Sequence, residues 1–404
     1  MILLLIEYLR AEFQIHIPAV FSYSSTRMIL AALTALLITI FVGPFFIKKL
    51  YELKIGQPIR NVDDCPVLAE LHKKKKNTPT MGGILILFSM IISLFLWMDL
   101  TSSFTLILLA TSICLGLLGA RDDYLKLRHK NSKGLRPKFK LAVQFLFSAL
   151  VALYLLWPAF GEAISSKSFF KPPVAKEFVN KGKGEAPKTM TTKEYMEQFY
   201  VPFIKDPVAY FKGPLIILSI LLILFVITGT SNAVNLSDGL DGLAGGLIVM
   251  VSGVFALFAF LSNHIEMARY LNILYIEGSG EIAIYLFALS GATLGFLWYN
   301  GYPAQIFMGD TGSLALGGVI GVSAVLLRRE ILLALAGGIF VAEALSVILQ
   351  VLSYRLRNKK RIFLCAPLHH HFEYKGWPET KVVLRFWIIG LILATIAIAS
   401  LKFQ

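Results

Sequence analysis

The chain has 404 residues; 56% of them are hydrophobic, only 16% are charged, and the net charge is +14. Soluble domains carry roughly 25% charged residues and interrupt their apolar runs every few positions. Here the apolar residues form runs of about 18 to 22, which suits a hydrocarbon core about 30 Å thick, and the short alternating segments of a transmembrane barrel are not visible. These features exclude a soluble domain. They predict an all-α integral membrane protein with a single polytopic domain over residues 1–404.

The first predicted element is the apolar segment Met1–Arg10, which contains Glu7 and lacks a basic leader and a small-residue cleavage site. This pattern is typical of an interfacial helix rather than a signal peptide. About ten transmembrane helices follow, over residues 28–47, 82–99, 104–120, 139–158, 214–233, 244–262, 282–299, 312–327, 331–354 and 382–401. Between the fourth and fifth spans, residues 159–213 form a long insert with a Gly- and Lys-rich run at 181–188, which predicts an irregular extracytoplasmic loop.

The positions of lysine and arginine predict the orientation of the spans, because cytoplasmic loops carry an excess of both. Three connections, at 48–81, 121–140 and 355–385, each carry eight Lys or Arg residues and lie on one face under the ten-span arrangement. The insert carries nine lysines, but long translocated loops are poor guides to orientation. We therefore expect the three basic connections in the cytoplasm and both termini outside.

The net charge of +14 has two interpretations, which can hold together. The ordinary charge bias of cytoplasmic loops, with its attraction to anionic lipid, explains most of it. The same residues can also form an electropositive mouth for a polyphosphate substrate. Binding to nucleic acid has no support, because the basic residues lie close to the ends of the spans.

Polar residues and glycines gather in five segments that all fall on the predicted cytoplasmic face. The segments are 78–83, 121–124, 235–242, 300–313 and 367–372. Together they hold five carboxylates and three histidines, namely Asp122, Asp123, Asp238, Asp241, Asp310, His369, His370 and His371. The opposite face has no comparable cluster in the sequence, and this asymmetry predicts a functional site at the cytoplasmic face.

Asp122 and Asp123 end an apolar span, and Lys126 follows at the spacing that places it on the same helix face as Asp122. One interpretation is a solvated span end with a local ion pair, since charges commonly flank spans. The other is a phosphate enzyme, in which one carboxylate binds a metal ion while its neighbour acts as a base.

Asn235, Asp238 and Asp241 are three residues apart, so one helical turn would align them on a single face. The glycines around them allow a ligand to approach the backbone closely. A simple Asp-Gly turn between two spans is the alternative, but two Asp-Gly pairs exceed what a turn requires. We favour a ligand or metal site, because polar groups near lipid are costly.

Asp310 belongs to a Gly-Asp-Thr-Gly-Ser segment that precedes another span. The glycines leave backbone N–H groups accessible near a helix start, where anions bind well. Asp310 itself offers oxygen ligands of the kind that magnesium takes.

The consecutive histidines His369, His370 and His371 allow two interpretations. A zinc site normally uses spaced ligands from several elements, and no helical pair of histidines four residues apart is present. Histidines beside a diphosphate can donate hydrogen bonds or charge, and we favour this substrate-binding role.

Glu343 and Gln350 are polar residues inside the predicted span 331–354, on one helical face. A carboxylate inside a span is a functional candidate, although it can equally serve a hydrogen bond between helices. The sequence assigns Glu343 no role.

From about Phe45 to Lys402 the sequence resembles the MraY family, the phospho-N-acetylmuramoyl-pentapeptide transferases, within the polyprenyl-phosphate N-acetylhexosamine-1-phosphate transferase superfamily. The matching segments are 72–75 with 78–83, the pair 122–123, 235–243, 307–313 and 367–373. The acidic motifs are shared across the superfamily, whereas the segments 78–83 and 367–373 are more specific to this branch. The insert at 159–213 departs from a compact family member.

The resemblance implies ten spans, a homodimer, Mg²⁺ as the cofactor and a location in the bacterial inner membrane. The implied substrates are UDP-N-acetylmuramoyl-pentapeptide and undecaprenyl phosphate, and the products are lipid I and uridine monophosphate. Whether a carboxylate attacks phosphorus first, or the lipid phosphate attacks directly, stays open.

The resemblance also implies roles for the matching residues. The implied catalytic residues are Asp310 as the magnesium ligand, Asp122 as the base, Asp123 near the lipid phosphate and His369 near the diphosphate. The implied substrate-binding residues are Asn235, Asp238 and Asp241 at the nucleotide and diphosphate, Phe307 beside the uracil, Lys75, Thr80, Asn300 and Gln350 at the nucleoside, and His370 with His371 at the diphosphate.

Three alternatives remain at this stage. A related enzyme could transfer N-acetylglucosamine-1-phosphate instead, but the triple-histidine segment argues against it. A secondary transporter with Glu343 as its proton-coupling carboxylate would gather its polar residues near the bilayer midplane, whereas these lie at one face. A structural scaffold leaves the acidic residues on one face unexplained.

Overall fold

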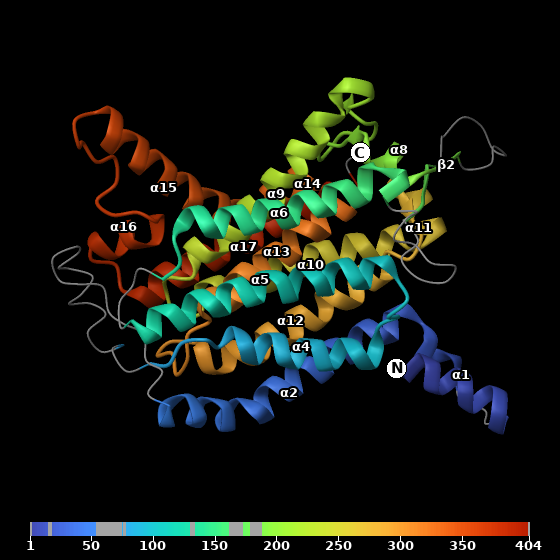
Figure 1. Cartoon of the computed structure of the whole chain (residues 1–404), viewed down its shortest axis with the longest axis horizontal. Coiled ribbons are helices and arrows are strands. Elements are labelled where there is room, and N and C mark those ends of the chain that lie inside the picture. Colours follow the sequence, from blue (N-terminus) through green and yellow to red (C-terminus); the bar gives the residue numbers. More distant parts are fainter. Residues whose placement is uncertain are drawn as a thin grey trace.

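The structure, a computed structural model, describes residues 2–14, 18–53, 75, 78–129, 134–160, 173–177 and 188–402. Helices dominate it (Figure 1). The helices are α1 Ile2–Phe13, α2 Ser24–Glu52, α4 Gly83–Trp97, α5 Ser103–Arg128, α6 Pro137–Leu156, α8 Thr192–Met196, α9 Ile216–Ser237, α10 Leu243–Ser262, α11 Ile265–Tyr270, α12 Gly280–Asn300, α13 Gly309–Leu326, α14 Glu330–Ala336, α15 Gly338–Leu356, α16 Leu368–Tyr374 and α17 Glu379–Ala399. The strands are β1 Ala175–Glu177, β2 Lys188–Met190, β3 Gln198–Phe199, β4 Ala209–Tyr210 and β5 Tyr275–Ile276.

Nine helices in the described part of the chain are long and apolar enough to cross a membrane: α2, α5, α6, α9 with its preceding turn, α10, α12, α13, α15 and α17. The shorter apolar helix α4, with 15 residues, covers the span predicted at 82–99. A helical multi-pass membrane protein is therefore confirmed, with small strands added to it. The count of ten spans and the side that the termini face stay predictions.

The span predicted at 331–354 is wrong in one respect, because the helix is broken into α14 and α15 at Gly337. Gly337 has φ −91° and ψ 23°, outside the α-helical region, and Gly338 follows it. Each glycine disfavours a helix by about 1 kcal/mol relative to alanine, so this pair is a natural position for the break. In Figure 1, α15 diverges from its neighbours and leads to α16.

The centre of the bundle is α13, whose residues from Asp310 to Leu326 are all buried. It packs mainly against α5 and α9, and it meets α4 near its start. The approach to α4 requires glycine on both helices, because a methyl group added at Gly83 would lie 2.1 Å from the backbone nitrogen of Gly312.

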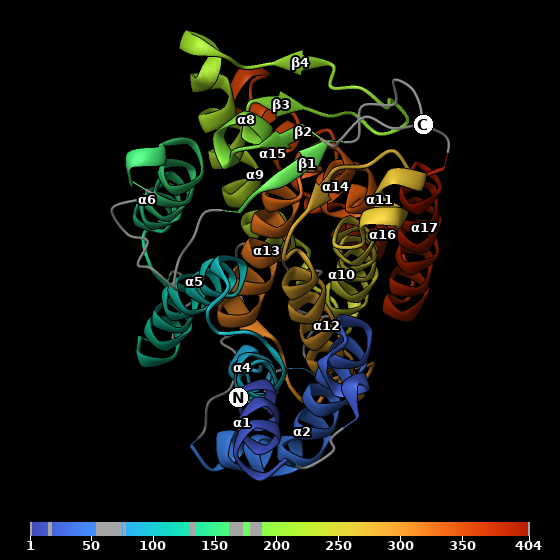
Figure 2. The same cartoon turned by 90° about the vertical axis from the view of Figure 1, so that its right-hand side faces the viewer.

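The bundle has two ends, the site end and the far end. The site end is where α5 and α9 end, where α10 and α13 begin and where α16 lies; the far end carries α8, α11 and the short strands (Figures 1 and 2). In Figure 1, α1 and the last turns of α17 lie toward the far end, as an even number of crossings requires.

The insert at 159–213 is more ordered in its described parts than the predicted irregular loop. β1 pairs antiparallel with β2 and β5, and β3 pairs antiparallel with β4 (Figure 2). The fully buried Arg328 anchors this segment, because its guanidinium donates to the carbonyl oxygen of Gln198 and pairs with Glu330. Residues 161–172 and 178–187 of the insert lie outside the described residues.

Candidate active site

Three carboxylates meet at the site end. Asp122 and Asp123 lie toward the end of α5, after its apolar run, and Asp310 lies in the first turn of α13. One oxygen of each lies within 4.8 Å of the others. Asp122 is 0% exposed, Asp123 is 3% exposed and Asp310 is 9% exposed, so the three charges are largely removed from water. The convergence of these residues, which come from distant parts of the sequence, agrees with the sequence prediction.

Asp123 joins α5 to the start of α13. One of its oxygens accepts a hydrogen bond from the backbone N–H of Asp310 at 3.1 Å. The other accepts from the backbone N–H of Thr311 at 2.9 Å and from its hydroxyl at 2.7 Å. The first N–H groups of a helix lack partners within the helix, and the helix dipole favours a negative charge there. Asp123 therefore holds Asp310 in place, and both of its oxygens are occupied by this contact.

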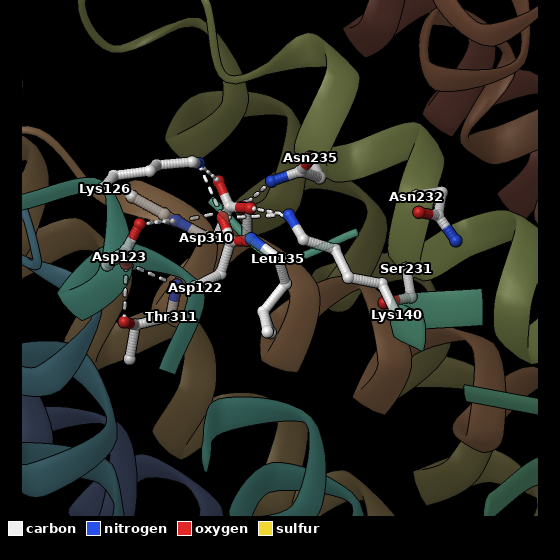
Figure 3. A network of polar contacts seen from close by, with 12 residues as sticks. Asp122, Asp123, Lys126, Leu135, Lys140, Ser231, Asn232, Asn235, Asp310 and Thr311 are labelled. Atoms are coloured by element: carbon white, nitrogen blue, oxygen red, sulfur yellow. Dashed lines mark hydrogen bonds and ion pairs between the residues drawn. The ribbon is translucent and has the colours of Figure 1, made fainter. Parts of the chain in front are cut away.

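Two lysines bridge the other two carboxylates (Figure 3). The ammonium group of Lys126 lies 2.7 Å from Asp122 and 2.9 Å from Asp310. That of Lys140, near the start of α6, lies 2.9 Å from Asp122 and 2.6 Å from Asp310. The ion pair predicted between Asp122 and Lys126 is confirmed, and it forms part of a larger cluster.

The donor set of this cluster fits a divalent cation. Carboxylate oxygens are the ligands that Mg²⁺ prefers, and three carboxylates from two helices converge here. The two ammonium groups show that the space between Asp122 and Asp310 attracts positive charge. Asp310 is a better candidate ligand than Asp123, because the oxygens of Asp123 already bind the start of α13.

A second charged cluster lies around Lys75. Its ammonium group is 2.5 Å from Asp241 and 2.6 Å from Glu379, the first residue of α17. It also lies 5.9 Å from the ring centroid of Phe307. Burial opposes the charge on Lys75, but attraction to Glu379 and Asp241 outweighs it and raises the pKa of Lys75. The structure thus brings together three residues that the sequence assigned to the donor nucleotide.

Asn235, Asp238 and Asp241 do not share a helix face, which corrects the prediction from their spacing. α9 ends at Ser237, and Asp238 already has φ −83° and ψ 55°. Gly242, at φ +78°, then turns the chain into α10 in a left-handed conformation that favours glycine. Asn235 therefore lies in the last turn of α9, whereas Asp238 and Asp241 lie on the turn that follows it, and the three face different partners.

The surroundings of Asn235 and Asp238 connect this turn to the start of α13. The amide of Asn235 donates to the hydroxyl of Ser313 at 2.8 Å. Burial, followed by the negative charges of Asp310 and Asp123, raises the pKa of Asp238 to about 7. With this pKa the carboxyl group of Asp238 is neutral at slightly acidic pH, and a nearby cation would favour its ionised form.

Asn300 holds two backbone segments together. Its side-chain oxygen accepts from the N–H of Gly242 at 3.0 Å, and its amide donates to the carbonyl of Ile306 at 2.8 Å. Thr80 is buried beside Gly309, since a methyl group added at Gly309 would lie 2.9 Å from the Thr80 hydroxyl. Both residues lie at the site end, and Asn300 links the backbone at Gly242 to the backbone at Ile306.

Two of the three histidines are paired with glutamates through the same ring nitrogen. Nδ1 of His369 lies 3.1 Å from Glu343, and Nδ1 of His370 lies 2.7 Å from Glu373. The third, His371, accepts from the backbone N–H of Leu364 at 3.1 Å through Nδ1. α16 therefore presents its first two histidines in an orientation set by buried acids.

Gln350 binds the protein's own backbone. Its side-chain oxygen accepts from the N–H groups of Ile362 and Phe363, both at 3.0 Å, and its amide donates to the carbonyl of Phe363 at 3.0 Å. It lines a cavity of about 230 Å³ together with Arg355 and Arg361. These contacts shape the connection between α15 and α16 rather than the acidic cluster.

Sequence reasoning missed Lys140 and Glu379, and it gave Glu343 no partner. Lys140 is one of many basic residues beside a span, and nothing local distinguishes it. Glu379 follows Pro378 at a helix start, where an acidic residue is common for reasons of helix stability alone. Glu379 contacts Lys75, 304 positions away, and Lys140 contacts Asp310, 170 positions away, so the sequence around each gives no sign of its role.

Known proteins share these segments. Residues 105–328 match the model of glycosyl transferase family 4, and residues 75–87 match signature 1 of the phospho-N-acetylmuramoyl-pentapeptide-transferases. Over 411 residues, 100% of both chains, the sequence is 64% identical to a phospho-N-acetylmuramoyl-pentapeptide-transferase of Protochlamydia amoebophila. Over 385 residues, 95% of both chains, it is 44% identical to one from Desulfotalea psychrophila.

Proposed function

The chain belongs to the phospho-N-acetylmuramoyl-pentapeptide transferase family, and we propose that it transfers phospho-N-acetylmuramoyl-pentapeptide from its uridine diphosphate carrier to undecaprenyl phosphate. The products are lipid I and uridine monophosphate. The observation that carries the proposal is the cluster of Asp122, Asp123 and Asp310 at one end of a membrane bundle, clamped by two lysines. A site at the end of the spans suits a reaction between a soluble nucleotide and a membrane lipid.

In this reaction an oxygen of the acceptor phosphate bonds to the phosphorus that carries the sugar. The bond from that phosphorus to the bridging oxygen of the diphosphate breaks, and uridine monophosphate leaves with that oxygen. Direct attack by the acceptor and a two-step route through a carboxylate both satisfy this balance. Catalysis of phosphoryl transfer depends mainly on positioning and on stabilising negative charge.

The acidic cluster and its lysines supply these two requirements. Lys126 and Lys140 carry ammonium groups that can bind phosphate oxygens. Asp122 is the candidate base for the proton on the acceptor phosphate, because one of its oxygens contacts both of the lysines that can bind that phosphate. Asp123 keeps the start of α13, and hence Asp310, at a fixed distance from α5.

Magnesium is the proposed cofactor, and Asp310 would hold it, with Asp122 and Asp123 beside it. When bound, it neutralises the diphosphate and the charge that develops on the transferred phosphoryl group. One oxygen of each carboxylate lies within 4.8 Å of the others, which supports this assignment.

The donor nucleotide is assigned to the residues around Lys75. The ammonium group of Lys75, held by Asp241 and Glu379, lies over the ring of Phe307, against which a uracil base can stack. His369 and His370 are assigned to the diphosphate. Thr80, Asn235, Asp238, Asn300, Gln350 and His371 complete the proposed site.

We place the site end in the cytoplasm of a bacterium and the protein in its inner membrane. The basic connections that follow α2, α5 and α15 support this orientation, because positive loops stay on the cytoplasmic side. A homodimer is part of the same proposal. The mass of the purified protein in a defined detergent micelle, with the detergent subtracted, tests it.

The function is tested with purified protein, undecaprenyl phosphate, magnesium and one of two donors. We expect uridine monophosphate to form with UDP-N-acetylmuramoyl-pentapeptide and not with UDP-N-acetylglucosamine, and its formation to stop when EDTA removes the metal. Release with only the N-acetylglucosamine donor would assign the chain to the related transferases. No release with either donor, from folded protein, would reject transferase activity.

A further inference from the structure

Glu343 is a fully buried carboxylate in α15, and both of its oxygens are directed at one residue. One oxygen accepts from the backbone N–H of His369 at 3.2 Å, and the other lies 3.1 Å from its Nδ1. His369 is itself 0% exposed. A carboxylate within an apolar helix carries a large desolvation cost, so a purely apolar residue would suit packing better.

The pairing with Glu343 determines which ring nitrogen of His369 is available. A carboxylate accepts hydrogen bonds only, so Nδ1 must carry the proton. Nε2 is then the free nitrogen, and in the described residues this buried atom has no hydrogen-bond partner. It points at the turn that carries Asp238 and Asp241, because a methyl group added at Gly239 would lie 2.3 Å from Nε2.

We propose that Glu343 is a positioning residue that acts through His369. It fixes the ring so that Nε2 faces the turn 238–241, and with Nδ1–H held by the carboxylate, a proton on Nε2 gives the imidazolium form. The Nε2–H of that form donates a charged hydrogen bond to a diphosphate oxygen of the donor. This inference rests on the proposed function, since it requires a diphosphate beside that turn. Hydrogen bonds from a charged donor are roughly twice as strong as neutral ones.

The decisive variant is Glu343→Gln, which preserves size and removes the charge. Its single carbonyl oxygen can accept from the backbone N–H of His369, but its NH₂ group then faces Nδ1. A ring that must accept at Nδ1 cannot be an imidazolium, so the charged donor is lost. We expect kcat to fall by about 10²-fold, with the KM for the nucleotide changed by less than about 3-fold. Glu343→Asp, which retains the charge on a shorter chain, should recover part of kcat.

A double-mutant cycle separates positioning from a structural role. If Glu343 acts only through His369, then Glu343→Gln combined with His369→Ala should be no slower than His369→Ala alone. A structural role predicts that the two losses multiply. The matched control is Ser346→Ala, one turn along α15, whose buried hydroxyl donates to the backbone carbonyl of Glu343 and not to its carboxylate. We expect this control to keep wild-type kcat.

The outcomes distinguish this inference from the proposed function. If the wild-type protein releases uridine monophosphate and Glu343→Gln matches Ser346→Ala in kcat, the positioning role is wrong and the function stands. Multiplicative losses in the double variant would also overturn it. If the wild-type protein is inactive with both donors, the proposed function fails first. Thermal melting of each variant, followed by intrinsic tryptophan fluorescence, checks that the compared proteins are folded.

Discussion

The contact between α5 and the start of α13 provides a sharp test of the site, because glycine sets it. Gly119 lies one turn before Asp122. A methyl group added there would lie 2.2 Å from the carbonyl oxygen of Asp310, 2.5 Å from its carbonyl carbon and 2.6 Å from the Cα of Thr311. All three atoms are backbone, so no side chain can rotate away.

The displacement in Gly119→Ala follows from these distances. Ordinary contacts between non-bonded atoms are about 3.5 Å, so the two helices must separate by roughly 1 Å. Such overpacking costs about 1–3 kcal/mol of stability, partly offset by about 1 kcal/mol from the better helix propensity of alanine. A misplacement of about 1 Å between reacting groups can reduce a rate by about 10²-fold. We therefore expect kcat to fall by about 10²-fold although every carboxylate is retained.

The matched control is Gly116→Ala, one turn earlier on the same helix. Its added methyl group would lie 2.8 Å from Cδ1 of Leu87, the end of a flexible side chain that can move. We expect this variant to keep kcat within about 3-fold of wild type and to melt at or above the wild-type temperature. The assay is magnesium-dependent release of uridine monophosphate, with melting followed in parallel. Wild-type kcat in a folded Gly119→Ala protein would refute the claim that this separation controls catalysis.

Three further predictions follow from the described contacts. Asp122→Asn should abolish turnover with little change in melting temperature. Asp123→Ala should abolish turnover and also lower the melting temperature, because each buried donor left unpaired at the start of α13 costs about 1–3 kcal/mol. Equal melting temperatures of the two variants would contradict the capping of α13 by Asp123. The pKa of Asp238 is raised to about 7, so the folded state binds the proton on this carboxyl group more tightly than the unfolded state does. Without magnesium, the contribution of Asp238 to stability is therefore full below about pH 4 and is lost as the pH rises through 7. The difference in melting temperature between pH 5 and pH 8 should be smaller in Asp238→Asn than in the wild type. Arg328→Met should destabilise the fold by about 3–5 kcal/mol, because Glu330 is left buried without its partner, yet the kcat of the folded fraction should not change; a loss of kcat without a loss of stability would mean that the far end communicates with the site.

The positions of the membrane helices could be predicted from sequence because burial in lipid imposes a length and an apolar composition on each segment. The break at Gly337 could not, because α14 and α15 are both apolar and a window of average hydrophobicity runs through them. The order in the insert was also missed. It depends on Arg328, which lies 130 positions from its partner Gln198 and belongs to a different part of the sequence.

The candidate site shows the same division between local and distant contacts. The pair Asp122 and Lys126 was predictable, since both lie on one helix at a spacing of four. The alignment of Asn235 with Asp238 was predicted wrongly, because the spacing suggests a continuing helix while α9 ends at Ser237. Lys140 required the start of α6 to lie near the end of α5 and the start of α13, which no local pattern encodes.

The buried ion pairs differ in chemistry between the two ends of the bundle. In the described residues, the buried pairs at the far end use arginine, in Arg27–Glu281 and Arg328–Glu330. Arginine is always charged and holds a fixed planar geometry, which suits a permanent connection between segments.

At the site end, the buried carboxylates pair instead with lysine or histidine. Lys75, Lys126 and Lys140 each contact two carboxylates, and His369 and His370 each contact one. Lysine is a compact charge on a flexible chain and histidine can change its protonation, so both can exchange a carboxylate for a phosphate oxygen. A buried ion pair is often no more stabilising than a well-packed apolar pair. The lysine and histidine pairs at the site end are therefore better explained by the binding of an anionic substrate than by a contribution to folding.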